Sequence, residues 1–209
     1  MNSRHVKCPS CGAEKEIHNP GVVTVVCEYC GTAIFWDDEK VLSAGRQAIL
    51  PEGFSRLYRG ATGKLKGVGF RVLGRVRYSF GKGFWDEWFV EIEDGSTGWL
   101  TEDNHEFAIQ QEKKRLTLPD MANLVPGRFV MVDGIKFYIQ EIGEAECTGM
   151  EGDLPIKIQT GEKYRYADGS SPDGRYVIGI EFDDDPPSVF TGKWLDYQDI
   201  SMDDEGLEW

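Results

Sequence analysis

Apolar and polar residues alternate in short runs from about residue 61 to residue 200, and turn sequences separate the runs. Four Asp-Gly dipeptides begin at residues 94, 133, 168 and 173. Alternation with a period of two is typical of half-buried strands, and an apolar stripe of helical period is present only weakly, in QQEKKRLTL. The pattern predicts a mainly β fold, with an antiparallel β-barrel or β-sandwich over residues 61–200. Two sub-barrels that meet near residues 115–127 are the alternative.

The clearest predicted hairpin is FVMVDGIKFYIQEI, at residues 129–142. A two-residue Asp-Gly loop pairs Val132 with Ile135 and Val130 with Phe137, so these four side chains share a core-facing side. A second hairpin, EKYRYADGSSPDGRYVIGIEF, has a longer loop, and FTGKWLDYQDI adds one more strand. We predict that the acidic end at residues 201–209 is flexible.

Two alternating runs within residues 70–93 carry charged residues on one side and apolar residues on the other. An antiparallel register that keeps the apolar sides together sets the arginines of the first run beside the glutamates of the second. Nearby carboxylates cancel the positive potential that a phosphate backbone needs, so we predict an internal row of ion pairs rather than a basic surface. The charged residues are Arg71, Arg75, Arg77, Glu87, Glu91 and Glu93, and the predicted core residues are Val72, Val76, Trp88 and Val90.

Four of the five cysteines fall in the first thirty residues, within the motifs CPSCG and CEYCG. Each motif curls the backbone so that two thiolates converge, and a spacing of fifteen residues between the pairs is typical of zinc sites. Predicted strands at EKEIH, VVTVVC and TAIFW complete a zinc ribbon over residues 1–38. We predict one structural zinc ion, because four thiolates leave no open position, and we disfavour a redox pair, which needs one motif in a βαβ context. The predicted ligands are Cys8, Cys11, Cys27 and Cys30.

Charge is distributed unevenly along the chain, whose net charge is −13. Residues 1–40 contribute −2 (four Lys/Arg, six Asp/Glu), residues 41–84 contribute +8 (nine and one), and residues 85–209 contribute −19 (ten and twenty-nine). We predict that residues 39–60 form a linker with one short helix around residues 41–49. The sequence shows neither a signal-peptide pattern nor the apolar run of about 18 residues that spans a bilayer. We therefore expect a soluble cytoplasmic protein, with peripheral membrane association left open.

Residues that could support catalysis are few and scattered. His105 lies beside Asp103 and Glu106 at a predicted turn, where a histidine is more often solvated than catalytic. Cys147 stands alone in EAECTGM, and we expect it to be a small buried apolar residue. The sequence contains no G-x-S-x-G, phosphate-loop or H-E-x-x-H motif. We therefore expect that the protein is not an enzyme.

Several motifs resemble a bacterial family of domains of unknown function that is sometimes carried behind a zinc ribbon. They are GRVRY at residues 74–78, WDEW at 85–88, WL at 99–100, EGDLP at 151–155 and YAD at 166–168. The resemblance covers roughly residues 55–200 and implies an accessory role near membrane-stress systems of the phage-shock type. It carries over no catalytic or binding residue.

Two classes of function remain as hypotheses. In the first, the chain is a non-enzymatic zinc-ribbon adaptor that binds a protein partner in the bacterial cytoplasm. Trp85 and Phe89 share the charged side of their run, and together with Arg75 and Arg77 they are the candidate partner-binding residues. Burial of this side beneath other structure is the alternative. In the second, the ribbon and the basic segment 41–84 bind nucleic acid, which the net charge and the nearby carboxylates disfavour.

Overall fold

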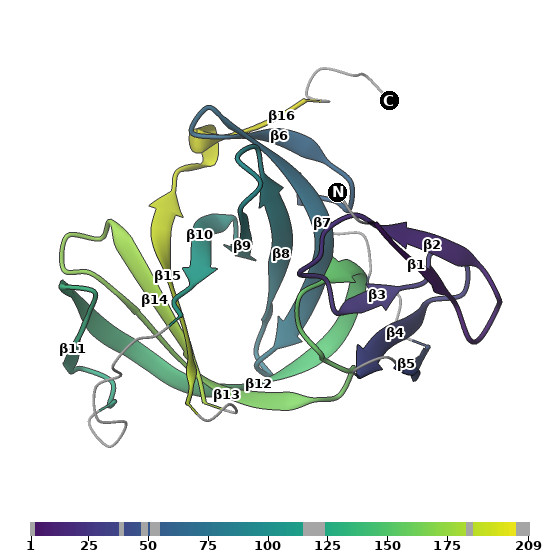
Figure 1. Cartoon of the computed structure of the whole chain (residues 1–209). Helices are drawn as coiled ribbons and strands as arrows, with labels where there is room; N and C mark the ends of the chain where they lie inside the picture. The colour runs from purple at the N-terminus through teal and green to yellow at the C-terminus, as the bar shows by residue number, and fades with distance from the viewer. Residues whose placement is uncertain are drawn as a thin grey trace.

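The computed structural model describes residues 3–37, 40–46, 50, 55–114, 124–182 and 186–203. This part of the chain is mainly β-structure, with sixteen strands, one short 3-10 helix and no α-helix. Most of the strands join one antiparallel sheet that curls into a barrel, and the N-terminal strands lie at its side (Figure 1). The prediction of a mainly β protein is confirmed, and of the two predicted architectures the barrel is the one that forms.

Eight antiparallel strands form a closed ring. Each strand pairs with the next, and β12 returns to pair with β7, so the ring has no free edge. Because side chains alternate along a strand, one parity of each strand points into the barrel and the other points outward. In order around the ring the strands are β7 (Val68–Ser79), β8 (Phe84–Ile92), β9 (Thr97–Asp103), β10 (Glu106–Glu112), β15 (Ser188–Leu195), β14 (Tyr176–Glu181), β13 (Lys163–Ser170) and β12 (Ile135–Leu154).

Short elements cover two areas of the outer wall. An apolar cluster around Trp88 and Leu100 on the wall is covered by β6, β16 and the segment that contains Leu57. A second cluster, around Phe137 and Ile178, includes the hairpin of β11 and β12. Outward-facing apolar side chains are therefore buried without filling the barrel itself. The covering elements are β6 (Thr62–Leu65), β11 (Phe129–Val132), the 3-10 helix (Tyr197–Asp199) and β16 (Ile200–Met202).

The N-terminal ribbon is built onto the long barrel strand β12. Strand β3 of the ribbon pairs with β4 on one side and with the C-terminal end of β12 on the other. One apolar cluster runs from ribbon residues such as Val25 and Ile34 to barrel residues such as Val76 and Leu154. The ribbon and the barrel thus share a core. The ribbon strands are β1 (Arg4–Lys7), β2 (Glu14–Ile17), β3 (Thr24–Val26), β4 (Thr32–Asp37) and β5 (Lys40–Arg46).

The predicted charged hairpin forms, but with a bulge. β7 and β8 pair antiparallel, and their four predicted core residues are at most 1% exposed. Arg71 lies opposite Glu91 as expected, and the register then shifts by one residue between Val72 and Gly74. Beyond this β-bulge the parity of β7 relative to β8 is reversed, so that Arg77 lies opposite Asp86.

Arg75 and Arg77 consequently pair with Asp86 instead of with the predicted glutamates. Arg77 donates to both carboxylate oxygens of Asp86, with Nε–Oδ1 at 2.8 Å and Nη2–Oδ2 at 2.7 Å, and Arg75 Nη2 lies 2.9 Å from Oδ2. All three side chains are buried. Internal compensation of these arginines is confirmed, but the predicted partners are wrong. No ion pair joins Arg71, Arg75 or Arg77 to Glu87, Glu91 or Glu93, all of which the structure describes.

The strand pairing also bears on the predicted helix, on the number of barrels and on the C-terminal end. β5 pairs with β4 over residues 40–46, where a short helix was predicted, because strand pairing outweighs a weak local preference; residues 47–49 lie outside the described part. The strands before and after residues 115–123 belong to the same ring, so the barrel is single. Residues 200–202 form a strand rather than a flexible tail, and residues 204–209 lie outside the described part.

The other two hairpins follow the prediction. Val130 pairs with Phe137 and Val132 with Ile135, and β13 pairs with β14 across the longer loop. Cys147 is fully buried, as expected, and His105 is exposed in the turn between β9 and β10. Within the described part of the chain, no helix has the length and apolar character needed to cross a membrane.

Candidate metal centre and barrel cavity

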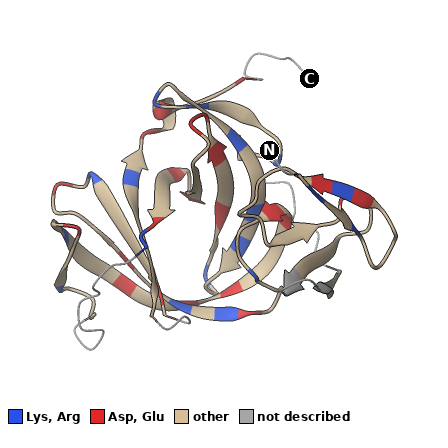
Figure 2. Ribbon diagram, in the orientation of Figure 1, with Lys and Arg blue, Asp and Glu red and all other residues tan. Residues whose placement is uncertain are grey.

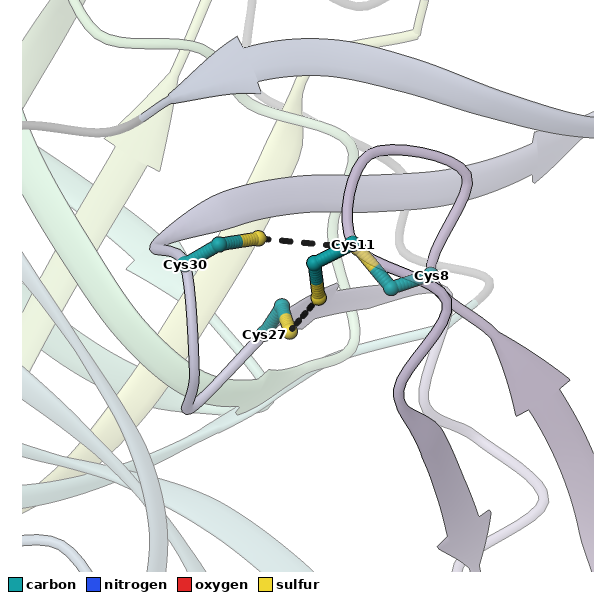
Figure 3. A group of neighbouring side chains, drawn as sticks. All are labelled: Cys8, Cys11, Cys27 and Cys30. Atoms are coloured by element: carbon teal, nitrogen blue, oxygen red, sulfur yellow. Dashed lines mark hydrogen bonds between the residues drawn. The ribbon is translucent and has the colours of Figure 1, made fainter.

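Two turns of the same construction bring the four cysteines together (Figure 3). In each turn the glycine N–H donates to the carbonyl of the first cysteine: Gly12 to Cys8 at 2.9 Å and Gly31 to Cys27 at 2.8 Å. The two glycines have φ angles of +80° and +68°, which a residue without a Cβ adopts at little cost. The two C-x-x-C-G motifs therefore have the backbone geometry that converging ligands require.

The four sulfur atoms fit one tetrahedral ion. Cys8 Sγ lies 3.6 Å from Cys30 Sγ, and Cys11 Sγ lies 3.6 Å from Cys27 Sγ. All four sulfurs lie within 4.8 Å of one another. Sulfurs bound tetrahedrally to zinc at about 2.3 Å would lie about 3.8 Å apart. The cluster can therefore hold a metal ion through all four predicted ligands.

The surroundings of the cluster favour thiolate at one ligand and fix the second turn to the barrel. Cys30 Sγ lies 3.2 Å from Thr32 Oγ1, and hydrogen bonding with the side chain and backbone of Thr32 lowers the pKa of Cys30 to about 6. Glu28, inside the second motif, lies 3.1 Å from Arg59 and 3.3 Å from Lys15. Lys15 also pairs with Asp153 at the end of β12. The second cysteine turn is thus connected to the barrel by ion pairs as well as by apolar packing.

The four candidate partner-binding residues lie inside the protein. Trp85 is 9% exposed, Phe89 3%, Arg75 5% and Arg77 7%. Arg75 stacks over the ring of Trp88, with the guanidinium carbon 4.7 Å from the ring centroid. These four side chains therefore form no exposed surface, and the alternative of a covered side is what the structure has. Basic and acidic segments are interspersed along the strands rather than separated on two faces (Figure 2).

The barrel interior contains a cavity of about 450 Å³. Side chains of seven of the eight ring strands line it: β8, β9, β10, β12, β13, β14 and β15. This volume lies within the range of small-molecule pockets, and eight-stranded barrels are wide enough to hold one small ligand. The sequence did not predict this site.

Acidic and aromatic side chains dominate the lining of the cavity. It contains six carboxylates and no Lys, Arg or His. Of these carboxylates, all but Glu181 lack an ion pair with any described residue. The acidic residues are Glu87, Asp103, Glu106, Glu141, Asp168 and Glu181; the aromatic ones are Phe80, Trp85, Trp99, Tyr164, Tyr166, Phe190 and Trp194.

Two of the carboxyl groups, those of Glu87 and Asp168, have pKa values that burial raises strongly. Burial, followed by the charge of Glu181, raises the pKa of Glu87 to about 8. Burial, followed by the charges of Glu141 and Asp103, raises the pKa of Asp168 to about 7. Both side chains keep intermediate exposure because they line the cavity. Near neutral pH Glu87 is therefore mostly protonated and Asp168 about half protonated, and the described lining offers neither group a cationic side chain.

A pattern in the sequence could have revealed this site. Along β9 and β13 the inward-facing residues run from aromatic to acidic, as Trp99-x-Thr101-x-Asp103 and Tyr164-x-Tyr166-x-Asp168. Apolar residues such as Leu100 and Ala167 occupy the other parity and are buried against the covering elements. The assumption that the apolar parity faces inward is reasonable for a filled barrel, and it concealed the polar parity of a hollow one.

Comparison with known proteins identifies one family. The model of the family described as Domain of unknown function (DUF4178) matches residues 59–197. This range includes all eight strands of the closed ring and the covering strands β6 and β11, and it ends before β16. The cysteine turns precede the matched range. Neither the curated proteins nor the solved structures contain a match. Because the family model covers more than half of the chain, the protein belongs to the DUF4178 family.

Proposed function

We propose that the protein is a non-enzymatic binding protein whose barrel receives a small molecule and whose ribbon is stabilised by zinc. The observation that carries this proposal is the cavity of about 450 Å³ inside a closed eight-stranded ring. A closed ring keeps its shape without a ligand, because every strand is hydrogen bonded on both sides. A preformed cavity lowers the ordering cost of binding, so the barrel is suited to a receptor role.

The composition of the two sites supports binding over catalysis. The described cavity lining contains no Ser, Cys, His or Lys, so it has no serine, cysteine or lysine nucleophile with a histidine base beside it. Four thiolates around one ion would fill a tetrahedral site and leave no position for a substrate or water. Zinc is the ion proposed, since a tetrahedral set of four sulfurs suits it. An iron ion bound by the same sulfurs would be distinguished by its colour.

The binding proposal is tested with a cavity-filling variant. Gly179 faces the cavity and has an ordinary strand backbone, and a Cβ added there would meet Asp168 Oδ1 at 3.4 Å. We therefore expect Gly179→Val to fold and to occupy the cavity. Saturation-transfer NMR with a chemically diverse fragment set should find compounds that bind the wild type and not Gly179→Val. Finding the same compounds with both proteins, or with neither, would contradict the proposal.

Acid–base catalysis by carboxyl groups is a second candidate function. The specific observation is that Glu87 and Asp168 have pKa values of about 8 and 7, which suit a general acid near neutral pH. A pair of carboxyl groups between aromatic rings is also the arrangement used to hydrolyse glycosidic bonds. Turnover of aryl glycosides by the wild type, abolished in Glu87→Gln, would favour this candidate. If the wild type hydrolyses none of a panel of aryl glycosides, the receptor role remains the supported function.

A further inference from the structure

We infer that the ligand of the cavity is an organic cation with two ammonium groups, a deeper reading that rests on the proposed receptor function. The lining offers hydrogen-bond acceptors and aromatic faces, and it has no cationic side chain. Anionic or strongly acidic ligands would be repelled by this lining. A cation relieves the repulsion among the carboxylates and also interacts favourably with aromatic rings.

The most specific part of the cavity is the space above Gly179. A Cβ atom added to this glycine would lie 3.4 Å from Asp168 Oδ1 and 3.5 Å from Gln110 Oε1. The Asp168 side chain forms no hydrogen bond or ion pair within the described part of the chain, and Gln110 Oε1 is buried without a partner. Two acceptors without a donor thus face one space that a glycine leaves open. A positively charged N–H donor in this space satisfies both.

Further carboxylates lie toward the mouth of the cavity. Asp103 and Glu106 flank the turn between β9 and β10, and Glu141 is exposed on β12. Glu87 lies deeper, because it pairs with Thr101, two residues before Asp103. Two residues along a strand span about 7 Å. Asp168 lies directly opposite Glu141 where β13 pairs with β12, so it belongs with the carboxylates near the mouth. The cavity therefore has an inner acidic group at Glu87 and an outer one, which includes Asp168, about 7 Å away.

This separation sets the architecture of the ligand. A single ammonium group can neutralise only one of the two acidic groups, whereas a linear molecule with ammonium groups at both ends can reach both. Its carbon chain would lie along the aromatic rings, among which Trp85 and Tyr166 stand in an edge-to-face arrangement with centroids 5.3 Å apart. Methylene groups gain from contact with such rings, and the adjacent ammonium groups gain from their negative faces.

Titration calorimetry with a matched set of four-carbon probes tests this inference. The probes are 1,4-diaminobutane, 1-aminobutane and 1,4-butanediol, which share a four-carbon chain and carry two, one and no ammonium groups. The diamine should bind the full-length wild-type protein at least tenfold more tightly than the monoamine, and the diol should show no binding. Equal affinities for the three probes would overturn the inference.

Protein variants localise the binding. Asp168→Asn and Glu87→Gln should each weaken diamine binding at least tenfold, and Gly179→Val should abolish it. Glu144→Gln is the matched control, because Glu144 is an exposed β12 carboxylate paired with Lys163 and does not line the cavity; its affinity should equal that of the wild type. Retained binding in Gly179→Val would place the diamine on the outer surface and overturn the inference.

Failure of the inference and failure of the receptor proposal give different results. If a neutral sugar or an anion binds the wild type and is excluded by Gly179→Val, the receptor function stands and the cationic ligand is wrong. If no compound distinguishes the wild type from Gly179→Val, both are wrong. Should Gly179→Val fail to fold, Gly179→Ala replaces it, because a single methyl group already enters the space between Asp168 and Gln110.

Discussion

The cysteine cluster and the barrel cavity both gather acidic groups, and they differ in how far apart they hold them. In the ribbon, two tight turns place four sulfurs within 4.8 Å of one another, a spacing that one metal ion bridges. In the barrel, six carboxylates surround a volume of about 450 Å³ among aromatic rings. A single bare ion cannot span that volume, whereas an organic cation can. The spacing of the anionic donors and the character of their neighbours together determine which cation each site suits.

The largest expected effect on metal binding and stability comes from replacing one of the four cysteines. Cys27→Ser should abolish stoichiometric metal binding and lower the free energy of unfolding by more than about 3 kcal/mol, because metal binding and ribbon folding are coupled. Since the ribbon and barrel share a core, the barrel should also unfold at a lower temperature. Elemental analysis and thermal denaturation measure the two effects. Cys147→Ala is the control: it removes a buried thiol and should keep one metal ion per chain.

The next prediction contrasts two neighbouring carboxylates of β8. Asp86 faces the outer wall and compensates two buried arginines, so Asp86→Asn should destabilise the protein by about 3–5 kcal/mol. Chemical denaturation of the variant and the wild type gives this value. A loss of stability below about 1 kcal/mol would mean that the arginines find other acceptors. It would contradict the view that Asp86 is their main partner on the outer wall.

Glu87, one residue further along β8, should behave in the opposite way. Its pKa is raised from 4.5 to about 8, so the folded state holds a proton that the unfolded state has lost between these pH values. Stability therefore falls as the pH rises from about 4.5 to 8, and the carboxylate remains unfavourable above that range. Glu87→Gln removes this penalty and should stabilise the ligand-free protein by roughly 1–3 kcal/mol at pH 9. At pH 4.5 the variant and the wild type should unfold alike.

The smallest expected effect is the pH dependence of diamine binding. Asp168 and Glu87 lose their protons around pH 7 and pH 8, whereas aliphatic ammonium groups stay charged until about pH 10. Affinity should therefore rise severalfold between pH 6 and pH 8.5, with release of protons on binding. Calorimetry in buffers of different ionisation enthalpy counts these protons. In Glu87→Gln both the rise in affinity and the proton count should be smaller.

The metal site could be predicted from the sequence because its geometry is local. Each C-x-x-C-G motif forms its own turn, and only one long-range step brings the two turns together. The hairpins were also predictable, since alternation and two-residue Asp-Gly turns act over a few residues. The ion pairs of β7 were misassigned because a single bulge at Leu73 reverses the parity. Gly74, an isolated glycine inside the strand pattern, is the local signal of this bulge.

The cavity could not be predicted by the same reasoning. Its acidic residues come from positions between 87 and 181 on different strands, and only the closure of β12 onto β7 places them around one space. Alternation identifies the two sides of each strand but not which side faces inward when both carry large side chains. Covering elements such as β6 and β16 bury the outer apolar side, which is why the polar side faces the interior.

A crystal structure of the wild-type protein with 1,4-diaminobutane is the direct test of whether the barrel cavity binds a diamine. We expect one diamine in the barrel, with one nitrogen above Gly179 within hydrogen-bond distance of Asp168 and Gln110, and the other nitrogen deeper in the cavity, toward Glu87. We also expect one metal ion bound by Cys8, Cys11, Cys27 and Cys30 in the same crystal. An empty cavity at saturating diamine, or a diamine bound only on the outer surface, would contradict the account.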